Sequence, residues 1–144
     1  MRKVKVKIMT LADELLPEYK TEQAAGCDLK NAGNTVRILR GHRAFFRTGV
    51  KIQLPDGYEA QVRGRSGLLR DHGIVVPTGT VDADYRGEIG VTLINLGDED
   101  YVVRPGERIA QLVIAKVRQA KWKKVDVLDP SARGTGGFGH TGRK

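Results

Sequence analysis

Hydrophobic and polar residues alternate with a period of two along most of this chain. Val50, Ile52 and Leu54 are separated by polar residues, and residues 58–62 and 89–93 follow the same pattern. Because successive side chains of a strand point to opposite faces, this period predicts strands with one buried face. Many short strands separated by turns predict an all-β protein, with a jelly roll as a natural candidate. The turn sequences are LPDGY at 54–58, NLGDED at 95–100 and RPGER at 104–108.

Helical structure is expected in only one short stretch. Residues 66–71, SGLLRD, fit one or two helical turns, with Ser66 near the N-terminus as a cap. The alternation ends near Pro130, and the remaining residues are rich in glycine with no hydrophobic period. The sequence therefore predicts one domain over residues 1–130 and a flexible Gly-rich C-terminal arm over 131–144. Trp122 is expected to pack in a strand near the surface.

The composition is that of one globular domain of ordinary size. The chain has 144 residues, of which 40% are hydrophobic and 29% are charged. No apolar run approaches the roughly 20 residues that are needed to cross a bilayer. The basic N-terminus also lacks the continuous apolar region of a signal peptide, so we expect a cytoplasmic protein with no membrane partner. Cys27 is the only cysteine and is expected to be a small buried side chain.

The net charge of +8 raises nucleic acid as a partner. Lysines and arginines are nevertheless spread along the chain, and in KVKVKI they alternate with Val4, Val6 and Ile8 as on the solvent face of a strand. This distribution argues against a dedicated binding tail, and a basic protein attracts small polyphosphates equally well. We expect no stable nucleic-acid complex, although charge alone does not choose between these partners.

Five segments interrupt the strand pattern with glycine and charged residues. In GRSG, two glycines, an arginine and a hydroxyl at a helix N-terminus favour an anion, because free backbone N–H groups and the helix dipole attract negative charge. Taken singly, each segment also has an ordinary interpretation as a turn with a helix cap, an acidic hairpin, a type II turn or a disordered tail. No P-loop sequence occurs, and the three histidines lack metal-ligand spacing. The segments are AAGCDL (24–29), GRSG (64–67), GTVDADYRGE (79–88), PGERIAQL (105–112) and RGTGGFGHTG (133–142).

In order and spacing, these five segments resemble the five motifs of the homotrimeric deoxyuridine triphosphate nucleotidohydrolases (dUTPases). The resemblance spans residues 24–142. It implies a distorted jelly roll of the β-clip type, a homotrimer with shared active sites, and Mg²⁺-dependent hydrolysis of dUTP to dUMP and pyrophosphate. That reaction would limit uracil incorporation into DNA and supply dUMP for thymidylate synthesis. The fifth motif would close over a neighbouring subunit's active site, which would explain an arm that has no packing pattern.

The resemblance also implies roles for individual residues. Asp82 would activate the water that attacks the α-phosphorus, and Arg133 would act as an arginine finger. Asp28 would hold Mg²⁺ through its water shell. Tyr85 would pack against the deoxyribose and leave no space for a 2′-hydroxyl, and Phe138 would stack on uracil. The other substrate-binding residues are Arg65, Ser66, Gly67, Gln111, Gly137, Gly139 and Thr141 toward the phosphates, and Thr80, Val81 and Gly90 toward the base.

Two positions depart from the family pattern. Cys27 stands where an aromatic residue usually precedes the aspartate of the first motif. Val76 stands where many bacterial members have an asparagine that helps to bind uracil. We therefore expect backbone groups to recognise the base.

Three alternatives to a dUTPase follow from the same residues. A dCTP deaminase of the same superfamily would have a glutamate where this chain has Thr92, and it would lack the glycine-rich fifth motif. A regulatory protein could use the same trimer without catalysis, but the joint presence of Asp82, Asp28 and Arg133 argues against it. A sequence-independent nucleic-acid binder would rest on the net charge alone, and its DNA binding would depend steeply on salt.

Overall fold

The computed structural model describes residues 3–138 and residue 140. Eleven strands, one α-helix and one 3₁₀ helix occur in these residues. The helices are η1 (Asp13–Leu15) and α1 (Ser66–His72). The strands are β1 (Lys7–Thr10), β2 (Gly26–Lys30), β3 (Val36–Ile38), β4 (Arg43–Arg47), β5 (Val50–Gln53), β6 (Tyr58–Arg63), β7 (Ile74–Val75), β8 (Gly79–Val81), β9 (Gly90–Asn95), β10 (Tyr101–Val103) and β11 (Arg108–Lys116).

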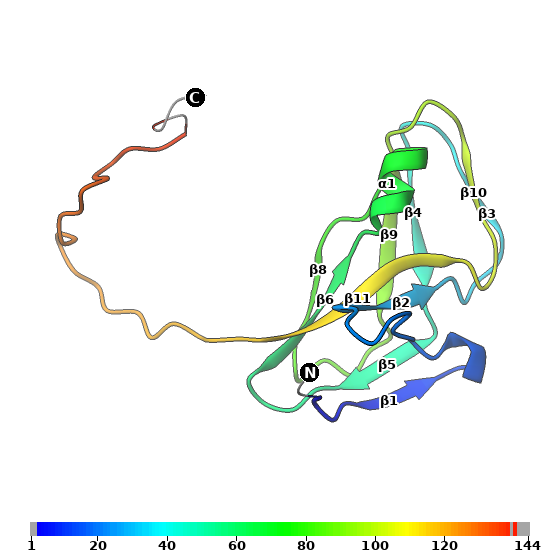
Figure 1. The fold of residues 1–144 in the computed structure, drawn as a ribbon, viewed down its shortest axis with the longest axis horizontal. Coiled ribbons are helices and arrows are strands. Elements are labelled where there is room, and N and C mark those ends of the chain that lie inside the picture. Colours follow the sequence, from blue (N-terminus) through cyan, green and yellow to red (C-terminus); the bar gives the residue numbers. More distant parts are fainter. Residues whose placement is uncertain (1–2, 139, 141–144) are drawn as a thin grey trace.

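The strands form four antiparallel sheets around one core (Figure 1). The largest sheet has the order β2-β11-β6-β8, and a second sheet has the order β4-β9-β7. The pairs β1-β5 and β10-β3 complete the body. Neighbouring strands are often far apart in sequence, since the last strand, β11, lies between β2 and β6. The prediction of an all-β jelly-roll fold with one short α-helix is confirmed.

The alternation in the sequence corresponds to buried and exposed positions in the strands. In β5, Val50 and Ile52 are buried whereas Lys51 and Gln53 are exposed. Cys27 is buried as expected, and its Sγ lies 3.5 Å from the Leu112 carbonyl oxygen, to which it donates. Burial raises the pKa of the Cys27 thiol, so the thiol is held in its neutral, unreactive form.

Phe46 is the largest of the fully buried side chains, with 2% of its surface exposed. Replacing it with alanine is expected to lower the free energy of unfolding by about 3–5 kcal/mol, because transfer free energy is lost and a cavity remains. Chemical denaturation at a fixed protein concentration measures this loss. Its neighbour in β4, Phe45, is 67% exposed, and Phe45→Ala is the matched control. Equal losses in the two variants would contradict the assignment of the core.

Helix α1 begins one residue earlier than a Ser66 cap requires. Arg65 occupies the N-cap position with extended backbone angles, and no side chain makes a capping hydrogen bond there. The prediction that Ser66 caps the helix was wrong, because Ser66 is the first residue inside the helix. The helix ends at Gly73, which has a φ of 66° and donates its N–H to the Leu69 carbonyl. The exposed Ser66 hydroxyl therefore makes no capping hydrogen bond to the helix.

The chain leaves the body after β11 and curves away from it (Figure 1). Residues 117–138 contain no strand or helix. The last strand ends at Lys116, which is ahead of the boundary expected at residue 130. Trp122 is 90% exposed, so the expectation that it packs in a strand was wrong. The segment around it has no neighbouring strand in its own chain. No helix in the described part of the chain is long and apolar enough to cross a membrane.

Candidate active site

A pocket of about 190 Å³ lies where the 82–89 loop joins β8 to β9. Asp82 and Tyr85 come from the loop. Thr80 and Val81 come from β8, and Gly90 begins β9. The structure thus brings together five of the six residues to which the resemblance gives roles toward the base, the sugar and the attacking water; the sixth, Phe138, lies in the arm. The full lining is Val62, Gly79, Thr80, Val81, Asp82, Tyr85, Glu88, Ile89 and Gly90.

Glu88 ties this loop to the body of the protein. Its carboxylate accepts hydrogen bonds from the Arg47 Nη2 at 2.8 Å and from the Gly49 N–H at 2.8 Å. Its backbone carbonyl accepts a hydrogen bond from the Tyr85 hydroxyl at 3.0 Å. The Arg47 hydrogen bond, helped by the Gly49 N–H, lowers the pKa of Glu88 below its ordinary value. Sequence reasoning missed Glu88, because its partners lie about 40 positions earlier in the chain.

Replacing Glu88 with glutamine is expected to lower stability at neutral pH by about 1 kcal/mol, since the Arg47 side chain is largely exposed and solvent screens the pair. The folded-state pKa is depressed. The stabilisation is therefore present above the unfolded pKa and is lost as the pH falls through the folded pKa. Urea unfolding between neutral pH and pH 3 measures this difference. The variant and the parent should converge in stability at the acid end, and a constant gap would contradict the prediction.

A second cluster lies at the opposite end of the same sheet, around Asp28 of β2. The Asp28 carboxylate is 3.2 Å from the Arg65 Nε and 3.1 Å from the Arg108 Nη1. The Arg65 Nη1 donates to the Arg108 carbonyl at 3.0 Å, which joins the two arginines. Gln111 faces Asp28 across the β2-β11 pair, and its Nε2 donates to the Gly64 carbonyl at 2.8 Å. The cluster therefore brings together residues from three of the five segments, AAGCDL, GRSG and PGERIAQL, around the buried carboxylate of Asp28.

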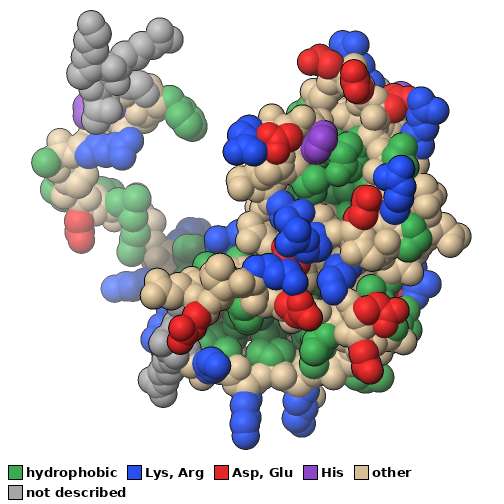
Figure 2. Space-filling model, turned by 45° about the vertical axis from the view of Figure 1, so that its right-hand side comes forward, with side chains coloured by type: hydrophobic (Ala, Val, Ile, Leu, Met, Phe, Trp, Pro, Cys, Tyr) green, Lys and Arg blue, Asp and Glu red, His purple; other side chains and the backbone are tan. Residues whose placement is uncertain are grey.

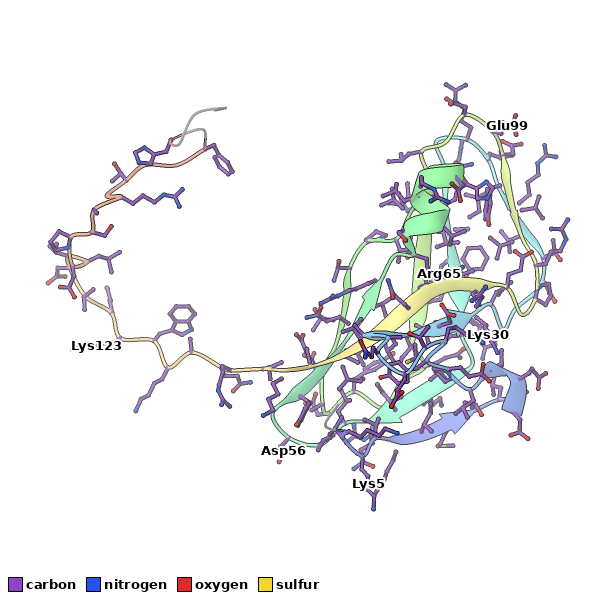
Figure 3. The ribbon with its side chains drawn as sticks, viewed as in Figure 1. Lys5, Lys30, Asp56, Arg65, Glu99 and Lys123 are labelled. Atoms are coloured by element: carbon purple, nitrogen blue, oxygen red, sulfur yellow. The ribbon has the colours of Figure 1, made fainter. Side chains whose placement is uncertain are left out.

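Both arginines line a pocket of about 300 Å³ beside α1, and Figure 3 shows Arg65 close to this helix. Lys and Arg side chains gather on this face of the body (Figure 2). Arg108 is a functional candidate that sequence reasoning missed, although it stands inside PGERIAQL. The exposed Ser66 and Gly67 follow Arg65 at the start of α1. The pocket is lined by Arg65, Leu68, Tyr101, Gly106, Glu107, Arg108 and Ile109.

The two regions do not meet within one chain. In the β6-β8 pair, Val81 lies opposite Ala60, so Asp82 follows at the level of Glu59. Gln111 lies opposite Arg63 at the other end of β6. The offset of four positions from Glu59 to Arg63 corresponds to about 13 Å of strand, and Arg65 lies further on. A residue set that includes both Asp82 and Asp28 cannot converge on one small ligand in a single subunit.

The described part of the arm, which includes Arg133, Gly137 and Phe138, extends away from the body (Figure 1). Arg133 Nε donates to the Gly136 carbonyl at 2.7 Å, within the arm itself. Phe138 is fully exposed, and the space beside Gly137 is open. Gly139 and Thr141 lie outside the described residues. The structure therefore does not place the arm residues near Asp82 or Asp28 of the same chain.

The residues present fit Mg²⁺ only if waters and substrate phosphates supply most of its ligands. No group of three or more His, Cys, Asp or Glu side chains that could hold a metal occurs in the described part of the chain. Asp28 offers one carboxylate, and each of its oxygens keeps capacity for a further hydrogen bond beyond the one arginine that it contacts. Mg²⁺ is commonly held by one or two carboxylates together with waters and substrate phosphates. This chemistry is compatible with Asp28 acting through water.

A model of the dUTPase family matches residues 13–142. The chain belongs to the dUTPase family. Its relatives include the deoxyuridine 5'-triphosphate nucleotidohydrolase of Chlamydia trachomatis, which is 53% identical over 131 residues and covers 88% of this chain and 90% of the relative. The protein of the same name from Anaplasma marginale is 49% identical over 145 residues, with 96% and 99% covered.

Solved structures of dUTPases share the fold. The Staphylococcus bacteriophage 80alpha dUTPase with dUPNHPP superposes with a TM-score of 0.89 at 27% identity, over 97% of this chain and 99% of that one. A mutant of the dUTPase from phage phi11 of S. aureus, whose structure reveals the coordination of a structural Mg(II) ion, has a TM-score of 0.80 at 23% identity, over 88% of this chain and 100% of that one. The family assignment made from five motifs is thus confirmed.

Proposed function

We propose that this chain hydrolyses dUTP to dUMP and pyrophosphate. The observation that carries the proposal is the pocket that gathers Asp82, Tyr85 and the backbone of β8 and β9 in a member of the dUTPase family. Two relatives about half identical to it are named as deoxyuridine 5'-triphosphate nucleotidohydrolases. The bacteriophage dUTPase of the same fold has the analogue dUPNHPP bound.

Asp82 is the proposed general base. Its carboxylate accepts the proton of a water molecule while that water's oxygen forms a bond to the α-phosphorus. The bond from the α-phosphorus to its bridging oxygen breaks, and pyrophosphate leaves. Tyr85 stands beside Asp82 in the pocket, with its hydroxyl held by the Glu88 carbonyl. A ring fixed there would pack on the deoxyribose and exclude a 2′-hydroxyl, while Thr80, Val81 and Gly90 would bind uracil through their backbones.

The Asp28 cluster is the proposed binding site for the triphosphate. Arg65 and Gln111, together with Ser66 and Gly67 at the start of α1, supply cationic and neutral donors for phosphate oxygens. Asp28 would hold Mg²⁺ through water, and a bound Mg²⁺ supplies charge neutralisation for the phosphates. In the free protein Asp28 keeps Arg65 in place by an ion pair. The arginine is therefore oriented before the substrate arrives.

We propose a homotrimer in which neighbouring subunits complete each site. The separation of Asp82 from Asp28 along β6 supports this arrangement, because one chain alone cannot bring both to one triphosphate. The arm, proposed as residues 131–144 beyond a domain of 1–130, would supply Arg133 and Phe138 from a neighbour, with Gly137, Gly139 and Thr141 along the phosphates. Its extension away from its own body supports this role. A cytoplasmic location stays a prediction.

Pyrophosphate release in the presence of Mg²⁺ tests the proposed function. The protein is incubated separately with dUTP, dCTP, dTTP and UTP, and fast release is expected from dUTP alone. Sedimentation of the same sample should give three times the chain mass of 15.8 kDa. Tyr85→Ala should raise the activity on UTP relative to dUTP. Release from none of the four nucleotides would overturn the proposal in favour of a regulatory role.

A further inference from the structure

The loop that carries Asp82 and Tyr85 is fastened to the body at its C-terminal end. The Ile89 N–H donates to the Val50 carbonyl at 2.8 Å, and the Thr48 hydroxyl donates to the Ile89 carbonyl at 2.6 Å. At its N-terminal end the loop follows directly from β8. The turn between β4 and β5 therefore positions the half of the loop that contains Tyr85, whereas β8 positions the half that contains Asp82.

Arg47 adds a side-chain contact to this backbone anchor. It ends β4 and pairs with Gly90, the first residue of β9. Glu88 stands two positions before Gly90, and alternate residues of an extended chain point to the same face, so its side chain emerges beside Arg47. The Arg47 Nε and Nη2 both donate to the Glu88 carboxylate, at 3.1 Å and 2.8 Å. A guanidinium that donates twice fixes the direction of the carboxylate as well as balancing its charge.

The Tyr85 ring rests directly on the backbone that carries this carboxylate. Its hydroxyl donates to the Glu88 carbonyl at 3.0 Å. A Cβ at Gly87 would overlap the ring and its hydroxyl, so the ring lies against the bare backbone of Gly87. The position of residues 87 and 88 therefore sets the position of the ring. Arg47 reaches the ring in two steps, through the Glu88 side chain and then through the Glu88 carbonyl.

We propose that Arg47 is a positioning residue for the rejection of ribonucleotides, because by holding Glu88 it fixes the Tyr85 ring where a 2′-hydroxyl would have to fit. The inference rests on the proposed function, in which Tyr85 packs on the deoxyribose. A 2′-hydroxyl adds a single oxygen, so a ring displaced by about 1 Å would admit it. All these contacts join residues of one chain, and they do not depend on which surfaces a trimer covers.

A purely stabilising ion pair is the alternative, and it has different consequences. The Arg47 side chain is 63% exposed in the single chain, so solvent screens the pair and its loss should cost little stability. The two Ile89 hydrogen bonds remain without it. A stabilising role would affect dUTP and UTP alike. A positioning role changes the ratio between the two nucleotides, because Asp82, at the other end of the loop, keeps its place.

Arg47→Met removes the guanidinium and keeps a long side chain. We expect kcat/KM for UTP relative to dUTP to rise about tenfold, the lower end of what one small group is worth in a pocket. Because Asp82 is unaffected, kcat for dUTP should stay within about threefold. Arg47→Lys keeps the charge without the double contact and should give an intermediate ratio.

Arg43→Met is the matched control for this loss of charge. Arg43 lies on the same face of β4 and takes part in none of the ion pairs in the described part of the chain. The control should keep the parent ratio. An unchanged ratio in Arg47→Met, or an equal change in Arg43→Met, would overturn the proposal.

A double-mutant cycle tests the route through the Tyr85 hydroxyl. Tyr85→Phe keeps the ring but removes its hydrogen bond to the Glu88 carbonyl, so the ratio should rise in this variant as well. If Arg47 acts through this bond, Arg47→Met should add little in the Tyr85→Phe background, because coupled residues are not additive. Fully additive effects would overturn the proposal.

Binding of non-hydrolysable analogues gives the same ratio without catalysis. The affinities of the parent and of Arg47→Met for dUPNHPP and for its ribonucleotide counterpart are measured by calorimetry. A parent that prefers dUPNHPP but releases no pyrophosphate from dUTP would fail the proposed hydrolysis alone, and a weaker preference in Arg47→Met would still support the positioning role. Equal affinities of the parent for the two analogues, or binding of neither, would overturn that role.

Discussion

Asp82→Asn is expected to lower kcat for dUTP by about 10²–10⁴-fold. The amide is nearly isosteric with the carboxylate but cannot accept the proton of the attacking water. Asp82 is exposed at the mouth of its pocket and is not one of the residues that tie the loop to the body. The substitution should therefore leave the fold intact, and the thermal midpoint should stay within a degree or two. Initial rates at saturating dUTP and Mg²⁺ measure the effect.

A neighbouring carboxylate provides the control. Asp84 lies in the same loop and is exposed, but it does not line the pocket. Asp84→Asn removes the same charge two residues away and should keep kcat within about threefold, because a surface charge in water contributes little. Binding of the non-hydrolysable analogue dUPNHPP, measured by calorimetry, should survive in Asp82→Asn. A comparable loss of rate in both variants would identify a general charge effect and contradict the role of Asp82 as the base.

The period-two alternation was sufficient to predict the strands, because it records which face of each strand is buried. Val50 and Ile52 of β5 and Val91 and Leu93 of β9 are all buried, as the pattern requires. The helix at SGLLRD was also correct in position. Its cap was not, since a single residue decides whether Ser66 lies before or inside the helix, and propensity does not resolve one residue.

The positioning of the site depended on contacts that local sequence does not contain. Glu88 pairs with Arg47 and Arg108 with Asp28, across 41 and 80 positions of the chain. No local sequence pattern marks either pair, because the partners meet only when distant strands align in the fold. Trp122 was expected in a strand, but no described strand of its own chain includes it.

Truncation after Pro130 is expected to lower kcat for dUTP by about 10³-fold or more, the range for loss of an arginine finger. The truncation removes Arg133, which would neutralise charge on the triphosphate, and Phe138, which would cover the base. Neither side chain packs on its own body: Phe138 is fully exposed, and Arg133 bonds only to Gly136 of the arm. The stability of the body should therefore be unchanged. Arg133→Ala in the full-length chain removes the arginine but keeps Phe138. Comparing it with the truncation therefore separates charge neutralisation on the phosphates from covering of the base.

Mixing two inactive chains tests whether the arm acts on a neighbour. Asp82→Asn supplies an intact arm, and the chain truncated after Pro130 supplies an intact Asp82. If the arm closes over another subunit, trimers assembled from both chains contain sites with a working base and a working arm, and activity reappears after subunit exchange. If the arm folds back on its own Asp82, every site in the mixture lacks one component and the mixture stays inactive. The separation of the arm from its own body, and of Asp82 from Asp28 along β6, leads us to expect recovery.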